Sequence, residues 1–176
     1  MKKTIIMLTA AMAFVAASAK DVKITSPDGK LVVLVTDDGG KASYSVTLDG
    51  RQMVTASALG LKTNIGDFSK GLTIVETKQK QVEKDYKMTR TKTSGSHYVA
   101  NQAIIGMTNA EGYRMDVTMN VSNNDVAFRY TLPRGKDDNP KCAVIYSEAS
   151  SFNFPQQTTT FICPQSKTMV GWERTK

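Results

Sequence analysis

The most regular alternation of apolar and polar residues runs from position 113 to position 132. Apolar residues occupy every second position over 113–121, and the alternation resumes over 126–132. Successive side chains of a strand point to opposite faces, so this period predicts strands with one buried face. Asn123, Asn124 and Asp125 separate the two runs and tolerate the backbone of a tight turn. The stretch therefore predicts an antiparallel hairpin, and Pro133 ends it because proline cannot donate to a ladder.

Turn signals divide the first third of the chain into short runs. Pro-Asp-Gly at 27–29, Asp-Gly-Gly at 38–40 and Asp-Gly at 49–50 recur about ten residues apart. This spacing predicts an antiparallel meander with strands at 21–25, 31–36, 42–48 and 52–54. The run at 31–36 is apolar almost throughout, so we expect a strand buried on both faces or covered by a second layer.

The rest of the chain shows the same character. We expect a strand that starts at 72–75 and continues into the polar residues after it, another at 98–107, and three more at 142–146, 151–154 and 158–162. No convincing amphipathic helix and no fixed-period repeat follow the first twenty residues. About ten to twelve strands predict an all-β domain of two packed, mainly antiparallel sheets.

The first nineteen residues have the pattern of a secretory signal peptide. Lys2 and Lys3 precede an apolar run at 4–16, and Ala-Ser-Ala at 17–19 forms a small-x-small cleavage site. An uncleaved membrane anchor is the alternative, but the apolar run is short for a bilayer. We therefore expect an exported protein, periplasmic or secreted, whose single domain spans 20–176. No later segment is apolar enough to cross a membrane, so no membrane partner is expected after cleavage.

Charge excludes one class of function. The net charge of +7 becomes 7 − 2 = +5 without Lys2 and Lys3, and lysines concentrate at 78–92. A surface for nucleic acid would interleave such a basic run with aromatic residues. Here only Tyr86 is aromatic, acidic residues interrupt the run, and export removes the protein from nucleic acid. We interpret 78–92 as a solvated strand pair or loop.

Candidate catalytic groups are sparse. His97 is the only histidine, and no Gly-x-Ser-x-Gly elbow accompanies it, so we expect a surface or loop residue. Glycoside hydrolysis needs two carboxyl groups that flank the scissile bond. The carboxyl groups considered, none of them paired by spacing, are those of Glu111, Asp116, Glu148 and Glu173. The sequence assigns no catalytic, cofactor-binding or metal-binding residue, and Asp-Asp-Gly-Gly at 37–40 is a turn rather than a calcium hand.

Three other residues leave alternatives open. In an oxidising compartment Cys142 and Cys163 could form a disulfide, or both could be buried free thiols. Trp172, the only tryptophan, could stack on a sugar ring or anchor the core.

Short motifs occur in a fixed order along almost the whole chain from position 20. They are Ser-Pro-Asp-Gly-Lys at 26–30, Asp-Gly-Gly-Lys at 38–41 with Tyr-Ser-Val at 44–46, Ser-Ala-Leu-Gly-Leu at 57–61, Phe-Ser-Lys-Gly-Leu at 68–72, Asn-Asp-Val-Ala-Phe-Arg-Tyr at 124–130, Glu-Ala-Ser-Ser-Phe-Asn-Phe-Pro at 148–155, Pro-Gln-Ser-Lys at 164–167 and Gly-Trp at 171–172. Together they resemble the N-terminal domain of glycoside hydrolase family 97, a family of exported α-glucosidases and α-galactosidases.

The resemblance implies a β-super-sandwich of the galactose-mutarotase-like carbohydrate-binding type. In that family a catalytic (β/α)₈ barrel follows, which carries the catalytic carboxylates and most ligands of a calcium ion. The acidic calcium ligand that the N-terminal domain lends lies beyond the point that matches Lys176. We therefore expect no activity and no cofactor in these 176 residues, with calcium only in the full-length enzyme. Asn153 and Trp172 are the candidate contacts with an α-linked oligosaccharide or with the barrel.

Two hypotheses follow from these observations. The first is the non-catalytic N-terminal domain of an α-glycosidase, incomplete at its C-terminal end, which packs against a catalytic barrel absent from this chain. The alternative is a free-standing exported β-sandwich that binds a glycan or a protein partner.

Overall fold

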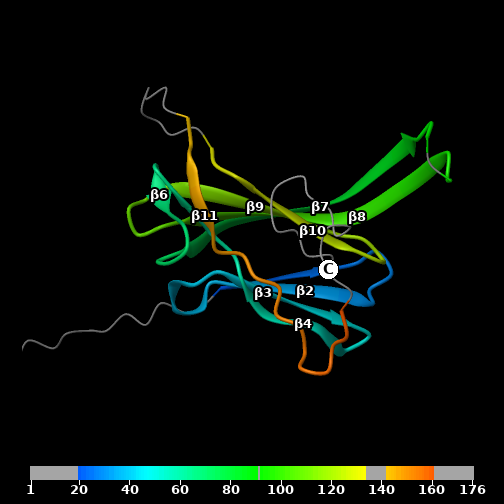
Figure 1. Cartoon of the computed structure of the whole chain (residues 1–176), viewed down its shortest axis with the longest axis horizontal. Helices are drawn as coiled ribbons and strands as arrows, with labels where there is room; N and C mark the ends of the chain where they lie inside the picture. The colour runs from blue at the N-terminus through cyan, green and yellow to red at the C-terminus, as the bar shows by residue number, and fades with distance from the viewer. Residues whose placement is uncertain (1–19, 91, 134–141, 161–176) are drawn as a thin grey trace, which may run out of the picture.

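Eleven strands make up most of the residues that the computed structural model describes, which are 20–90, 92–133 and 142–160 (Figure 1). The strands are β1 (Asp21–Thr25), β2 (Leu31–Thr36), β3 (Ser43–Leu48), β4 (Arg51–Ala58), β5 (Leu61–Thr63), β6 (Gly66–Asp67), β7 (Thr73–Lys87), β8 (Gly95–Thr108), β9 (Arg114–Val121), β10 (Val126–Thr131) and β11 (Ile145–Glu148). Within these residues the only helical element is a 3-10 turn, η1 (Asp38–Gly40). The all-β prediction is confirmed.

Two four-stranded antiparallel sheets face each other across the core. One has the order β1-β2-β3-β4 and the other the order β10-β9-β8-β7, as the lower and upper layers of Figure 1 show. A third, smaller sheet of order β11-β5-β6 was not predicted. It arises because the chain bends at Gly60, whose φ of 152° lies in a region that residues with a Cβ rarely adopt.

The hairpin of β9 and β10 lines the core as predicted. Its register runs from Val126 opposite Val121 to Thr131 opposite Asp116. The fully buried residues of β9 are Met115, Val117, Met119 and Val121. Tyr113 does not continue this face and is 47% exposed, because it precedes β9 in a turn where its N–H donates to Asn109 Oδ1.

Of the two alternatives for 31–36, cover by a second layer is confirmed and burial on both faces is wrong. Val33 and Val35 of β2 are fully buried, but Leu34 between them is 38% exposed. Strand β2 belongs to a sheet that has another layer on one side, and alternate side chains point to the opposite side. The strand boundaries at 21–25 and 31–36 are confirmed by β1 and β2.

The basic stretch forms a long solvated strand pair, as predicted. Strand β7 continues without a break through Lys87 and pairs with β8 along its length, from Thr73 opposite Thr108 to Lys87 opposite Gly95. Strand β9 pairs with β8 only between Asn101 and Thr108. The distal part of β7 and β8 is therefore a two-stranded arm, which projects beyond the sandwich in Figure 1.

The last described segment, 142–160, contains one strand rather than three. Only β11 is regular, and residues 151–154 and 158–160 are not strands, while 161 and 162 lie outside the described residues. The segment still runs antiparallel to 55–64. Ala149 N–H donates to Gly60 O at 2.9 Å, Ser151 N–H to Ala58 O at 3.1 Å, and Thr55 N–H to Asn153 O at 2.7 Å. It therefore covers the otherwise free edge of β4.

No helix among the described residues is long and apolar enough to cross a membrane.

Candidate interaction surface

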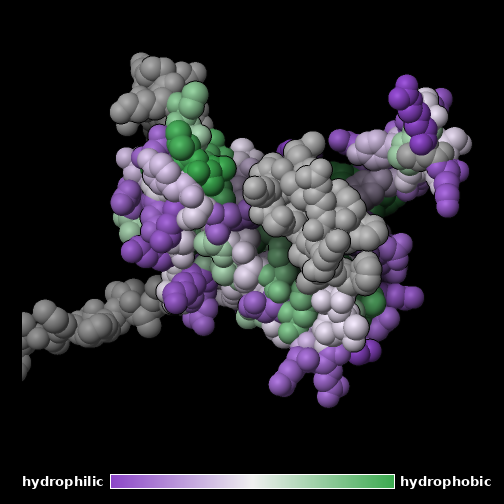
Figure 2. All heavy atoms as spheres, viewed as in Figure 1, coloured by the Kyte–Doolittle hydropathy of each residue, from purple (hydrophilic) through white to green (hydrophobic). Residues whose placement is uncertain are grey.

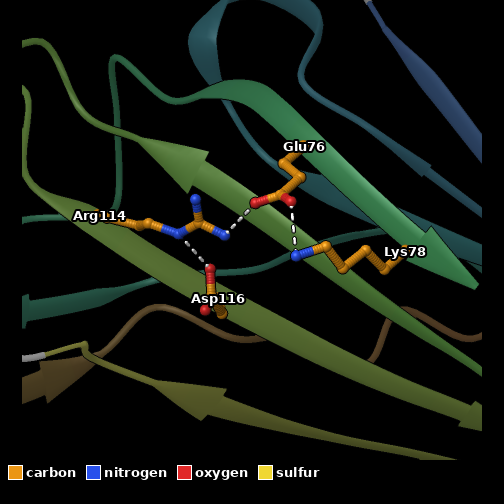
Figure 3. A network of polar contacts seen from close by, with 4 residues as sticks. All are labelled: Glu76, Lys78, Arg114 and Asp116. Carbon is orange, nitrogen blue, oxygen red and sulfur yellow. Dashed lines mark hydrogen bonds and ion pairs between the residues drawn. The ribbon is translucent and has the colours of Figure 1, made fainter.

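Four charged residues form a network on the outer face of the β10-β9-β8-β7 sheet (Figure 3). Arg114 donates from Nε to Asp116 Oδ1 at 2.7 Å and from Nη2 to Glu76 Oε2 at 2.8 Å. Lys78 Nζ lies 2.7 Å from Glu76 Oε1. Gly106 of β8 lies between these strands, and a Cβ there would be 2.5 Å from Arg114 Nη2. The glycine therefore provides the space in which the guanidinium crosses β8.

The charges of this network stabilise the pairing of neighbouring strands and do not suit acid catalysis. Hydrogen bonds from Lys78 and Arg114 lower the pKa of Glu76 to about 2. A glycosidase general acid needs a raised pKa so that it carries a proton near neutral pH. Of the four candidate carboxyl groups, Asp116 belongs to this network, Glu111 lies in the turn before β9 and Glu148 lies in β11. Glu173 lies outside the described residues.

His97 is an exposed residue of the arm, which confirms the prediction of a surface position. Its Nδ1 lies 2.7 Å from Asp85 Oδ1, and its Nε2 lies 3.3 Å from Glu83 Oε1. The hydrogen bond with Asp85 raises the pKa of His97 above 6.5. His97 and these two exposed carboxylates form a local cluster of charged groups on the arm.

A shallow hollow lies where the turn before β9 meets the loop after β6, lined in part by Asp67, Lys70 and Glu111. The side-chain oxygen of Asn109, at the wall of this hollow, already accepts hydrogen bonds from the N–H groups of Glu111 and Tyr113. Across 20–90, 92–133 and 142–160 no group of three or more His, Cys, Asp or Glu residues could hold a metal ion. Calcium in a full-length enzyme stays a prediction.

Aromatic side chains fasten the segment 142–160 to the open edge of the sandwich. The hydroxyl of Tyr130, on β10, accepts from Gly60 N–H at 2.9 Å and lies 2.5 Å from Ser150 Oγ. The Tyr44 hydroxyl donates to Ser151 O at 3.2 Å. The ring of Phe152 packs 6.0 Å from that of Phe128, centroid to centroid. Burial raises the pKa of Tyr130, so its hydroxyl stays protonated and available for both bonds.

Asn153, a candidate contact with sugar or barrel, is anchored to β4. Its backbone N–H donates to Ser57 Oγ at 2.8 Å and its Nδ2 to Ala56 O at 2.7 Å. The structure thus gives Asn153 a role in holding the segment, and its contact with a sugar or a barrel stays a prediction. Cys142 is exposed, so the alternative of a buried thiol is wrong at this position. Cys163 and Trp172 lie outside the described residues, so the disulfide and the roles of Trp172 stay predictions.

Five large apolar side chains of this segment face outward. Each is between 49% and 69% exposed, and they are Val144, Ile145, Tyr146, Phe152 and Phe154. Ile145 and Tyr146 are consecutive in β11 and point to opposite sides of the strand, so the five side chains do not form a single face. We call these five exposed residues together the 144–154 surface. Figure 2 shows hydrophobic residues gathered over β11 at the upper left. An exposed apolar group of this kind marks an interaction site in a soluble protein.

Sequence reasoning missed this surface, although one signal was available. Residues 143–146 are four consecutive residues, Ala-Val-Ile-Tyr, without polar alternation. Such a run predicts a strand covered on both sides, yet Val144, Ile145 and Tyr146 are each half or more exposed.

Comparison with known proteins matches most of the chain to one family. The profile described as glycosyl-hydrolase 97 N-terminal matches residues 24–175. The crystal structure of a beta-arabinopyranosidase is 43% identical and covers 89% of this chain, with a TM-score of 0.79. A glycoside hydrolase family 97 enzyme from Pseudoalteromonas sp. strain K8, solved in complex with panose, is 20% identical over 77% of this chain, with a TM-score of 0.68. That second likeness shows the fold alone.

A relative is also found by sequence. The probable retaining alpha-galactosidase of Streptomyces bingchenggensis (strain BCW-1) is 27% identical over 123 residues, which is 70% of this chain. The chain spans only 25% of the arabinopyranosidase, 20% of the Pseudoalteromonas enzyme and 18% of the galactosidase. All three relatives are thus several times longer than the sequence compared with them.

Proposed function

This chain belongs to the glycosyl-hydrolase 97 N-terminal family, and from that membership we propose that it is the non-catalytic sandwich that completes a catalytic domain. The single observation that carries the proposal is the 144–154 surface, whose side chains are half or more exposed. In a complete enzyme this surface packs against the catalytic barrel. Burying large apolar and aromatic side chains supplies the stabilisation that holds two domains in one orientation.

The way the surface is held suits such a role. Tyr130 and Asn153 fix the backbone of 142–160 to β10 and β4 through hydrogen bonds, so Phe152 and Phe154 project from an anchored segment. Preorganised side chains lose less conformational freedom on binding than side chains of a mobile loop. The proposed contact is therefore rigid on the side of this domain.

The substrate class follows from the named relatives. The more similar solved structure is a beta-arabinopyranosidase and the curated relative a probable alpha-galactosidase. A β-L-arabinopyranoside has the ring configuration of an α-D-galactopyranoside and lacks only its hydroxymethyl group. We therefore place the whole enzyme among hydrolases of α-glycosidic bonds, with galactosides and arabinopyranosides ahead of glucosides. Export, with removal of residues 1–19, is part of the same proposal.

A chimera tests the packing. This chain replaces the matching quarter of the beta-arabinopyranosidase, and hydrolysis of nitrophenyl arabinopyranoside and galactoside is measured. We expect the chimera to be active and this chain alone to be inactive. The variant Ile145→Ser/Tyr146→Ser/Phe154→Ser should lose most of the activity of the chimera and lower its melting temperature.

The control variant is Leu34→Ser/Met53→Ser, which removes exposed apolar side chains elsewhere on the sandwich. It should leave the chimera active. Equal activity in both variants would contradict the proposed contact, provided that circular dichroism shows both sandwiches folded. Tight binding of α-linked oligosaccharide by this chain alone would instead support a free-standing glycan-binding sandwich.

A further inference from the structure

The arm of β7 and β8 has no role in the contact proposed above. Beyond Asn101, where pairing with β9 ends, β7 and β8 pair only with each other. Most side chains over 83–97 are exposed on both faces of this ribbon. A two-stranded ribbon extending into solvent is marginally stable by itself, so its length calls for a function.

Charges on the arm are only partly separated in space, because Lys87 shares the face of β7 that carries Glu83 and Asp85. The acidic residues Glu83 and Asp85 share one face of β7 and are both held by His97. Lys84 and Tyr86 alternate with them and therefore point to the opposite face, where Tyr98 lies directly across from Lys84. The tip carries further cations. Four basic residues lie at or near the tip, namely Lys84, Lys87, Arg90 and Lys92.

These cations are available to a partner. Within the described part of the chain, the ion pairs of the arm join His97 to Glu83 and Asp85 and engage none of the four tip cations. Two apolar side chains lie among the cations, because Tyr86 is 48% exposed and Met88 is 36% exposed. Basic residues around exposed aromatic and aliphatic side chains are typical of protein segments that rest at the surface of an anionic bilayer.

The shape of the arm favours a planar partner. A sugar site encloses its ligand in a concave pocket, whereas the arm is a convex finger at the upper right of Figure 1, and its tip is strongly hydrophilic in Figure 2. A finger can present cations to phosphate headgroups while Tyr86 and Met88 enter the interfacial layer.

We propose that the tip of the β7–β8 arm, formed by Lys84, Tyr86, Lys87, Met88, Arg90 and Lys92, docks the protein on a bilayer of anionic phospholipid. The contact combines attraction of four cations to lipid phosphates with shallow insertion of two apolar side chains. It is reversible and weakens as ionic strength rises, since salt screens exposed charges. The inference is independent of the proposed function, because the arm and the 144–154 surface share no residue.

Vesicle sedimentation tests the inference. The purified chain is mixed with phosphatidylcholine vesicles that contain phosphatidylglycerol, and with pure phosphatidylcholine vesicles. We expect binding only to the anionic vesicles, with loss at high salt. Neutralising one cation should weaken binding about fivefold, so Lys84→Gln/Lys87→Gln/Arg90→Gln/Lys92→Gln should abolish it. Tyr86→Ser/Met88→Ser should weaken binding and leave its salt dependence intact.

A matched control distinguishes the tip from overall charge. It removes four exposed lysines elsewhere on the sandwich, as Lys23→Gln/Lys30→Gln/Lys41→Gln/Lys62→Gln, and should retain binding. Equal loss in both quadruple variants would overturn the proposal and assign binding to net charge. Binding of dextran sulfate but not of anionic vesicles would also overturn it, and would assign the tip to a soluble polyanion. Thermal melts of every variant confirm that the sandwich stays folded.

Discussion

At the scale of single residues, Gly106 shows how a residue without a side chain leaves room for a charged side chain from the next strand. The Arg114 guanidinium crosses β8 over Gly106 to reach Glu76 on the far strand. Sequence could not reveal this, because an isolated glycine in a strand equally indicates a bulge. The contact of Arg114 with Glu76 depends on the strand order, because β7 lies two strands away from β9 in the sheet.

The first prediction concerns Gly106→Ala. A Cβ there displaces the Arg114 guanidinium, so the pKa of Glu76 should rise from about 2. It should stay below 4.5 because Lys78, the largest cause of the shift, is untouched. Nuclear magnetic resonance titration of the Glu76 carboxyl group measures the change. Gly95→Ala in the same strand is the control, since its Cβ would meet an atom only at 3.6 Å.

The sign of the pH dependence follows from the same shift. Glu76 has a lower pKa in the folded chain than its ordinary 4.5. Its contribution to the free energy of unfolding is therefore complete above pH 4.5 and is lost as the pH falls toward 2. The contribution is small, because water and salt screen an exposed pair. Gly106→Ala should reduce this acid sensitivity without unfolding the sheet.

At the scale of elements, the contrast between β9–β10 and the segment 142–160 shows which strands a sequence can reveal. The hairpin was predictable because its alternation and its turn lie within twenty consecutive residues. The segment 151–154 is held by Tyr44 and Ser57, which are about a hundred residues earlier in the chain. Its bonds run partly through side chains, and no local pattern encodes them.

The second prediction concerns Tyr130→Phe. The substitution removes the hydroxyl that bonds with Gly60 N–H and Ser150 Oγ. Two lost hydrogen bonds at a largely buried site should lower the free energy of unfolding by about 1–3 kcal/mol. Urea denaturation measures the loss, and hydrogen exchange should rise over 142–160. Tyr113→Phe, at an exposed ring, should change neither quantity.

At the scale of the whole molecule, the outline was predictable and the exposed 144–154 surface was not. Ordered motifs indicated the family, which the match over 24–175 confirms, and turn spacing indicated the packed sheets. The exposure of Ile145 and Tyr146 was not visible in the sequence. A run of apolar residues has the same composition whether its own domain or another domain covers it.

The third prediction follows from that exposure. By itself the chain should self-associate as its concentration rises, because the apolar side chains of the 144–154 surface are exposed. Sedimentation velocity measures the association, and Ile145→Ser/Tyr146→Ser should shift it toward monomer. Leu34→Ser/Met53→Ser, which removes scattered exposed side chains, should not. A wild-type chain that stays monomeric at every concentration would contradict the prediction.

The bonds between β4 and the segment 142–160 also bear on biosynthesis. They join residues 93 to 98 positions apart in sequence. The edge of β4 therefore stays unpaired from the moment the first sheet forms until 142–160 docks on it. An unpaired edge is a template for aggregation during that interval. The residues of β4, Arg-Gln-Met-Val-Thr-Ala-Ser-Ala, are mostly polar or small, which makes that edge a poor template for another chain before its neighbour arrives.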